Sequence, residues 1–95
     1  MIMTVLEAQV DPARHNDLLN AYHEAARDPK PAGLVRSTLL QASGDPSVWR
    51  IETLWESREA LLAMRSAGGT PRGILIFRAA GAEPAVSMFT VAAQL

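Results

Sequence analysis

The sequence predicts an α+β fold in which helices cover one face of a four-stranded antiparallel sheet. Strand-like and helix-like patterns follow one another in the order β-α-β-β-α-(α)-β. A short polar turn joins the second and third strands, which makes this pair an antiparallel hairpin. Such an order is typical of the split β-α-β, ferredoxin-like arrangement, and it accounts for residues 1–95 as a single domain.

The first third of the chain predicts a strand followed by a helix. Residues 2–10 carry apolar side chains on both faces, as a strand does when neither face is fully solvated. Asp11 is a good helix N-cap, and Pro12 suits the first helical position, so we expect a helix over residues 12–27. Two prolines and a glycine in residues 28–33 end this helix.

The middle of the chain predicts a hairpin and a second helix. Strands are expected over residues 34–42 and 48–56, with the turn cluster SGDP at residues 43–46 between them. Ser57 then suits a helix N-cap, and the short helix that it opens should end at residues 68–69, which are both glycine.

The last third contains one ambiguous segment, residues 70–80. Thr70 as a cap, Pro71 at the first helical position and Gly81 as a stop favour a helix, whereas GILIF alone also suits a short buried strand. We prefer the helix because start and stop signals are both present. A final strand over residues 85–95 completes the sheet.

Composition and charge exclude several classes of protein. The chain has nine basic and ten acidic residues, a net charge of −1 and no basic block, so neither nucleic acid nor an anionic membrane is an expected partner. Cysteine is absent, which excludes disulfides and thiolate metal sites. We find no signal-peptide pattern and no apolar run of about 20 residues. A soluble, cytoplasmic protein is therefore expected.

The apolar residues on both strand faces predict a homodimer. Helices can cover only one face of the sheet, and an uncovered face should be mostly polar. A large uncovered apolar face is an association site, and a second copy of the chain is its simplest cover. We therefore expect two copies to pack sheet to sheet with two-fold symmetry. The alternative is a monomer with an exposed apolar face.

Both tryptophans of the chain lie in the stretch SVWRIETLWES. Trp49, Ile51, Thr53 and Trp55 share one face of the third strand because side chains alternate along a strand. We expect this face to meet the helices. It would form either the wall of a pocket for a flat apolar ligand or an ordinary packed core.

The polar candidates for chemistry are few. His15 and His23 are the only side chains with an ordinary pKa near neutrality, and His23, beside Tyr22, is the candidate catalytic base. The alternative for His23 is a surface or interface position. The two histidines are eight residues apart and are not an i, i+4 metal pair, and no third ligand is visible, so we expect no metal. Three arginines either ring a pocket mouth and attract an anion or are simply solvated: Arg65, Arg72 and Arg78.

The segment GLVRSTLLQASGDPSVWRIETLWESREALLAM resembles the antibiotic-biosynthesis-monooxygenase (ABM) family of dimeric α+β barrels. The matching features are Gly33, Asp45-Pro46, Trp49, Trp55, Ser57 and the REAL of residues 58–61. The closing AEPAVSMFTV also resembles the last strand of the family. The resemblance implies the ferredoxin-like fold and a dimer.

The resemblance also implies several activities. Some members are cofactor-independent monooxygenases of aromatic polyketides or quinols, some degrade haem, and some have no established activity. The Asn, Trp and His of the haem-degrading branch fall near Ala8, Met64 and Ile74, so haem degradation is not expected. Many members carry a His where this chain has Met64 and a Glu where it has Thr53, and any oxygenase activity would lack these usual polar residues.

Two functions are compatible with these observations. The first is a cofactor-independent monooxygenase that acts on a small aromatic or quinone-like substrate, with His23 as the base. The expected pocket residues are Trp49, Thr53, Trp55, Met64 and Phe77. The alternative is a non-catalytic, dimeric protein that binds a small ligand or has an accessory role on the same scaffold.

Overall fold

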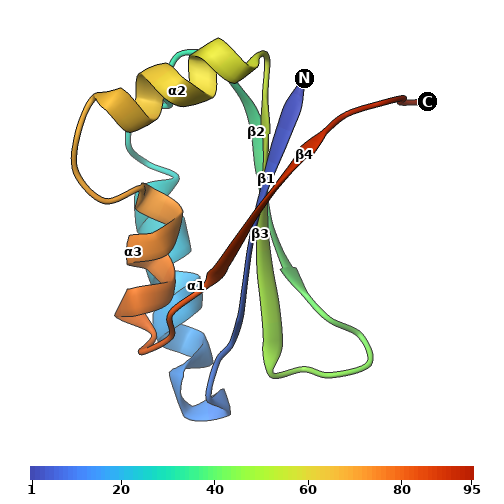
Figure 1. The fold of residues 1–95 in the computed structure, drawn as a ribbon. Helices are drawn as coiled ribbons and strands as arrows, with labels where there is room; N and C mark the ends of the chain where they lie inside the picture. The colour runs from blue at the N-terminus through green and yellow to red at the C-terminus, as the bar shows by residue number, and fades with distance from the viewer.

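The computed structural model describes residues 1–95 and contains one antiparallel sheet with helices on one side of it (Figure 1). The elements are β1 (Ile2–Gln9), a 3-10 turn (Pro12–Arg14), α1 (His15–Ala25), β2 (Leu34–Gln41), β3 (Val48–Trp55), α2 (Arg58–Ser66), α3 (Arg72–Ala79) and β4 (Ala85–Thr90).

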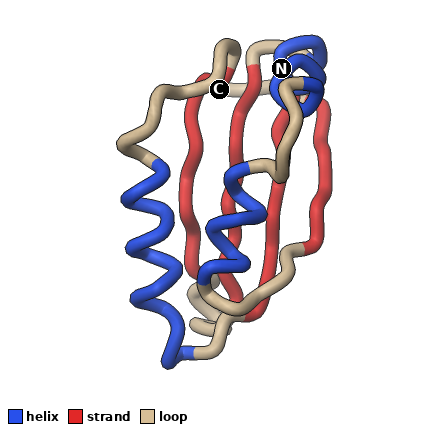
Figure 2. The backbone as a smooth tube through the Cα atoms, turned by 90° about the vertical axis from the view of Figure 1, so that its left-hand side faces the viewer, coloured by secondary structure: helices blue, strands red, loops and turns tan.

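The sheet has the strand order β2-β3-β1-β4, and every neighbouring pair is antiparallel. Figures 1 and 2 show all three α-helices against the same face of this sheet, while the opposite face is uncovered. Helices α1 and α3 pack side by side. The predicted α+β, ferredoxin-like fold is therefore confirmed.

The first helix is shorter than predicted. Asp11 does act as a cap, because its Oδ1 accepts a hydrogen bond from Ala13 N at 2.9 Å. The turn that it opens is a 3-10 turn, however, and α1 itself begins only at His15 and ends at Ala25. A 3-10 turn is common at the start of a helix, because its tighter hydrogen bonds satisfy backbone N–H groups that have no partner within the α-helix.

The hairpin and α2 follow the predicted boundaries closely. The Asp45 carboxylate accepts hydrogen bonds from the Ser47 hydroxyl and the Ser47 backbone N–H, and these bonds hold the pKa of Asp45 below its usual value. The Ser57 hydroxyl accepts from Ala60 N at 3.1 Å, so the predicted cap is confirmed. Gly68 follows α2 with a φ of 88°, a conformation that favours glycine.

Residues 70–80 contain a helix, as preferred, but its cap was wrongly predicted. The N-cap residue of α3 is Pro71 rather than Thr70, and no side chain caps the helix. Proline fixes its own φ near the observed −52° but offers no side-chain acceptor. Gly81 ends the helix with a φ of 75°, as its position predicted.

The final strand is also shorter than predicted, because β4 ends at Thr90 rather than at Leu95. Its partner is β1 alone, and the pairing closes where Val91 N donates to Met1 O at 3.0 Å. Apolar content alone suggested a longer strand, but a strand persists only where a neighbour accepts its backbone hydrogen bonds.

Two groups of buried side chains hold the helices on the sheet. Trp49, Leu18 and Phe77 belong to the larger group, which joins α1 and α3 to the sheet. Trp55 and Leu61 belong to the smaller group, which joins α2 to the sheet. The core is thus divided along the length of β3, with one tryptophan in each part.

One close approach fixes α2 against the start of β2. Gly33 has a φ of 84°, and a Cβ added there would overlap the Cβ of Ala60 on α2. The Gly33 carbonyl also accepts a hydrogen bond from Glu56 N at 2.8 Å. Only glycine satisfies both the backbone conformation and the lack of space.

We predict that Gly33→Ala lowers the free energy of unfolding by about 2–4 kcal/mol, because it adds backbone strain to an overlap with Ala60. Gly44→Ala is the matched control, since a Cβ at Gly44 meets nothing within 4 Å and should change stability by less than about 0.5 kcal/mol. Urea denaturation followed by circular dichroism measures both. Equal losses in the two variants would contradict this account of Gly33.

Candidate functional site

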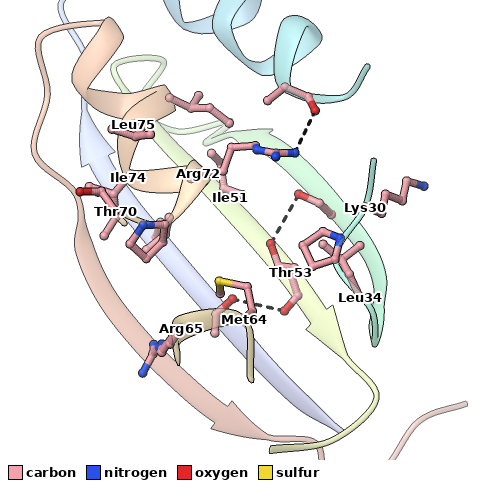
Figure 3. A pocket seen from close by; sticks show the side chains of 18 of the residues that line it. Lys30, Leu34, Ile51, Thr53, Met64, Arg65, Thr70, Arg72, Ile74 and Leu75 are labelled. Carbon is pink, nitrogen blue, oxygen red and sulfur yellow. Dashed lines mark hydrogen bonds between the residues drawn. The ribbon is translucent and has the colours of Figure 1, made fainter. Parts of the chain in front are cut away.

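A cavity of about 560 Å³ lies between the sheet and the helices (Figure 3). This volume is in the range that small-molecule sites occupy. The walls come from the helix-facing side of the sheet, the C-terminal end of α1, the segment before β2, α2 and the start of α3. The apolar lining residues include Leu6, Leu34, Ile51, Trp55, Leu61, Met64, Ile74, Leu75, Ile76 and Val86.

The cavity borders both groups of core side chains. Ile51 and Ile76 belong to the larger group, while Trp55 and Leu61 belong to the smaller one, and all four line the cavity. The cavity therefore lies between the part of the sheet that α1 and α3 cover and the part that α2 covers. This position gives the cavity mostly apolar walls, which suit a flat hydrophobic ligand.

A row of hydroxyl groups crosses the sheet side of the cavity. Thr4 on β1 is paired with Thr53 on β3, and Thr53 is paired with Ser37 on β2. All three residues line the cavity. The Thr53 and Ser37 hydroxyls are 3.5 Å apart, a contact that Figure 3 marks beside the labelled Thr53. Each hydroxyl can donate and accept, so the row can bind a carbonyl or a hydroxyl of a ligand.

Two aromatic side chains extend this polar row. The Tyr22 hydroxyl on α1 donates to Ser37 Oγ at 3.1 Å. At the other end, Trp55 Nε1 donates to Thr4 Oγ1 at 3.3 Å, so the buried indole N–H has a partner. The extended row thus links α1 to three strands of the sheet, through Tyr22, Ser37, Thr4 and Trp55.

The charged residues in the lining are mostly cationic: Asp28, Lys30, Arg65 and Arg72. In Figure 3 the Arg72 side chain extends over the cavity from α3, whereas the ends of Lys30 and Arg65 point outward at opposite edges. Arg72 Nη1 donates to the Ala25 carbonyl at 3.4 Å, and Arg72 Nη2 lies 3.8 Å from Asp28 Oδ2. The third arginine named from the sequence, Arg78, pairs with Glu83 at 2.7 Å and does not line the cavity.

The structure brings three of the five expected pocket residues together. Thr53, Trp55 and Met64 line the cavity. Trp49 and Phe77 do not, because both are buried within the larger core group, where Phe77 is fully inaccessible. Alternation along β3 correctly puts both tryptophans on the helix-facing side, but the helices α1 and α3 fill the space beside Trp49.

The histidines lie away from the cavity. His23, the expected base, is exposed on α1 and is not among the lining residues. His15 Nε2 lies 3.0 Å from the Val10 carbonyl oxygen, and its ring packs edge-on against Trp49 with centroids 5.1 Å apart. The indole N–H of Trp49 is buried without a hydrogen-bond partner, unlike that of Trp55.

Thr4, Ser37 and Tyr22 were not expected as site residues from the sequence. A usable signal for Thr4 was its place among apolar residues that face the helices, because a polar side chain there needs a partner. Ser37 and Tyr22 carried no such signal. Their role depends on the strand register and on the position of α1, which only the folded chain shows.

Two further kinds of site are not found in the structure. No three histidine or carboxylate side chains are grouped so that they could hold a metal ion. None of the helices combines the length and the apolar character that crossing a membrane requires.

Solved structures with the same fold come from several organisms. A variant of SnoaB, a cofactor-independent oxygenase from Streptomyces nogalater, superimposes with a TM-score of 0.72 at 18% identity over 99% of this chain and 95% of that one. A conserved protein of unknown function from Bacteroides thetaiotaomicron gives 0.70 at 20% identity over 93% and 94%. A conserved protein from Methanosarcina mazei gives 0.66 at 16% identity over 93% and 89%. At these identities the likeness establishes the fold alone.

Family membership rests on the sequence itself. No curated protein matches the chain. The family model described as antibiotic biosynthesis monooxygenase matches residues 1–69, which include β1, α1, the hairpin and α2. With the fold, this match confirms the resemblance inferred from the hairpin and the corner at Trp55: the chain belongs to the antibiotic biosynthesis monooxygenase family.

Proposed function

We propose that this protein is a cofactor-independent monooxygenase whose substrate is a small aromatic or quinone-like molecule bound in the cavity. The observation that carries the proposal is the cavity itself, which combines apolar walls with the hydroxyl row of Thr4, Thr53 and Ser37. Membership of the monooxygenase family supports it. A flat ring would pack on the apolar walls while its oxygen atoms meet the hydroxyls.

The chemistry that suits such a site draws its electrons from the substrate. An electron-rich ring carbon, once the substrate is ionised, can transfer electrons to O2 directly. In an anthrone-type substrate, a CH2 group becomes C=O, one oxygen atom enters the product and the other leaves as water. The protein then supplies orientation and a water-poor environment for the ionised ring.

The first prediction of the proposed function concerns catalysis and His23. The wild-type protein should consume O2 when supplied with anthrone-type or quinol substrates, as an oxygen electrode measures. Because His23 is exposed and outside the lining, we expect His23→Ala to retain this activity within about twofold. Loss of oxygen uptake in that variant would instead identify His23 as the base. An absence of uptake across the substrate panel would contradict the monooxygenase proposal.

The second prediction distinguishes the two tryptophans. Trp55 lines the cavity and Trp49 does not, so a bound aromatic ligand should quench the emission of Trp55. We therefore expect Trp49→Phe to keep most of the ligand-dependent quenching and Trp55→Phe to lose most of it. Fluorescence titration with one ligand on both variants measures this. Stronger quenching in Trp55→Phe than in Trp49→Phe would place the ligand elsewhere.

A second candidate function is ligand binding without catalysis. The observation that favours it is that the cavity lining contains no histidine and a single carboxylate, Asp28. A dimeric binding or accessory protein on this scaffold would give the quenching described above without oxygen consumption. The two measurements together therefore separate the two functions.

We further propose that the active form is a homodimer in which the uncovered sheet faces pack together. Met3, Leu54 and Phe89 are aligned across β1, β3 and β4 on this face, and Phe89 is 56% exposed. Beside them, Arg50 lies 2.7 Å from Glu7 and 3.3 Å from Glu52. The hydrogen bonds to Glu7 and Glu52 raise the pKa of Arg50. Leu54 is already buried in the single chain, so the accessible members of the row, Met3 and Phe89, would supply affinity. The ionic cluster would fix the register of the two copies.

The third prediction tests this dimer. The wild-type protein should sediment as a dimer at micromolar concentration. Phe89→Glu should weaken the dimer at least about tenfold, because it places a charge on the most exposed side chain of the apolar row. Leu62→Glu is the matched control, since Leu62 is 50% exposed on α2, away from this face, and should leave the dimer intact. A monomeric wild-type protein would overturn the proposal.

A further inference from the structure

We infer that the cavity binds its ligand as an oxyanion, such as the ionised form of a phenol or enol, and that Arg72 is the residue that holds this charge. The inference rests on the proposed function, because it concerns the ligand of the same cavity. It adds the side chain that selects the ionised form of that ligand.

The distribution of charge in the chain supports an anionic ligand. The whole protein has a net charge of −1, with ten acidic and nine basic residues. The cavity lining, in contrast, has three cations and only one carboxylate, Asp28. A concave surface of one sign with apolar walls concentrates ligands of the opposite sign.

Among these cations, Arg72 is placed to touch a ligand. Figure 3 shows its side chain over the cavity, whereas Lys30 and Arg65 point outward. Arg72 is the residue that opens α3, next to Gly73, and a Cβ on Gly73 would lie 2.5 Å from Leu6 Cδ1 on β1. The start of α3 is therefore pressed against the sheet, while the Arg72 guanidinium extends across the cavity toward the Ala25 carbonyl at the end of α1.

The present contacts of Arg72 leave it free to bind an anion. Its bond to the Ala25 carbonyl is 3.4 Å long, and its 3.8 Å separation from Asp28 exceeds hydrogen-bond distance. Both side chains of the Arg72–Asp28 pair are about half exposed, so this pair is weak. A guanidinium has five N–H donors, and an oxyanion would offer it shorter, charge-assisted bonds.

The remaining polar groups of the cavity are suited to neutral oxygens. The hydroxyls of Thr4, Ser37 and Thr53 are uncharged, and Tyr22 already donates to Ser37. A ligand with two oxygens could therefore place its neutral oxygen on the hydroxyl row and its ionised oxygen on Arg72. A phenol or enol becomes this anion when its O–H bond breaks and the proton passes to water, with no transfer of electrons.

This inference predicts a lowered pKa of a bound phenol. A cation in contact favours the ionised form, so para-nitrophenol bound to the wild-type protein should have a pKa lower by about one unit or more than the free compound. Titration of its phenolate absorbance at saturating protein measures this. Asp28→Asn should lower the pKa of the bound probe further, because it removes the competing carboxylate.

Matched variants identify the residue responsible. Arg72→Met should abolish the lowering, and Arg72→Lys should retain part of it. Arg65→Met removes a cation from the same lining but should leave the pKa of the bound probe unchanged, because that side chain points outward. Circular dichroism checks that each variant folds. Equal effects of Arg65→Met and Arg72→Met would overturn the assignment to Arg72.

The outcomes also separate this inference from the proposed function. If para-nitrophenol binds with the pKa of the free compound or a higher one, the inference fails, and the cavity remains a site for neutral aromatic ligands. If neither phenols nor quinols bind, the proposed function fails together with it.

Discussion

The antiparallel pairing of β1 with β3 is the constraint on which the rest of the structure depends. Because side chains alternate along a strand, this register directs one set of side chains toward the helices. A shift of the pairing by one residue would move every one of these side chains to the opposite face of the sheet. Trp49 and Trp55 then lie toward opposite ends of the helix-facing side. Between them lies the pair of Thr4 and Thr53, whose short hydroxyl side chains leave space above the sheet.

The helices convert this row of small side chains into a cavity. Helices α1 and α3 cover the part of the sheet near Trp49, and α2 covers the part near Trp55. Gly33 allows α2 to approach β2, while Gly73 allows the start of α3 to approach Leu6 on β1. Neither helix fills the region between these contacts. The approach of α3 to the sheet at Gly73 also positions the neighbouring Arg72 over the cavity. Backbone packing therefore determines where the positive charge of the site lies.

The two faces of the sheet differ in their chemistry. On the helix-facing side, β1 and β3 present the uncharged hydroxyls of Thr4 and Thr53 to the cavity, with the hydroxyl of Ser37 beside them on β2. On the other side, the same strands carry the ionic cluster of Glu7, Arg50 and Glu52 beside an apolar row. Removing water from a hydroxyl costs much less free energy than removing it from an unpaired charge. The enclosed side, which carries hydroxyls, is therefore suited to ligand binding, and the open side, where the charges are paired, is suited to contact with another chain.

The sequence by itself determined the order of the elements and the side of β3 that meets the helices, because local signals suffice for both. Ser57 and Gly81 mark helix ends through their own backbone and side chains, and alternation along one strand pairs the two tryptophans. Only the tertiary structure decided that Trp55 lines the cavity and Trp49 does not, and that Arg72 rather than His23 reaches it. These outcomes depend on the positions at which the helices pack on the sheet, because a cavity is the space between segments that are distant in the chain.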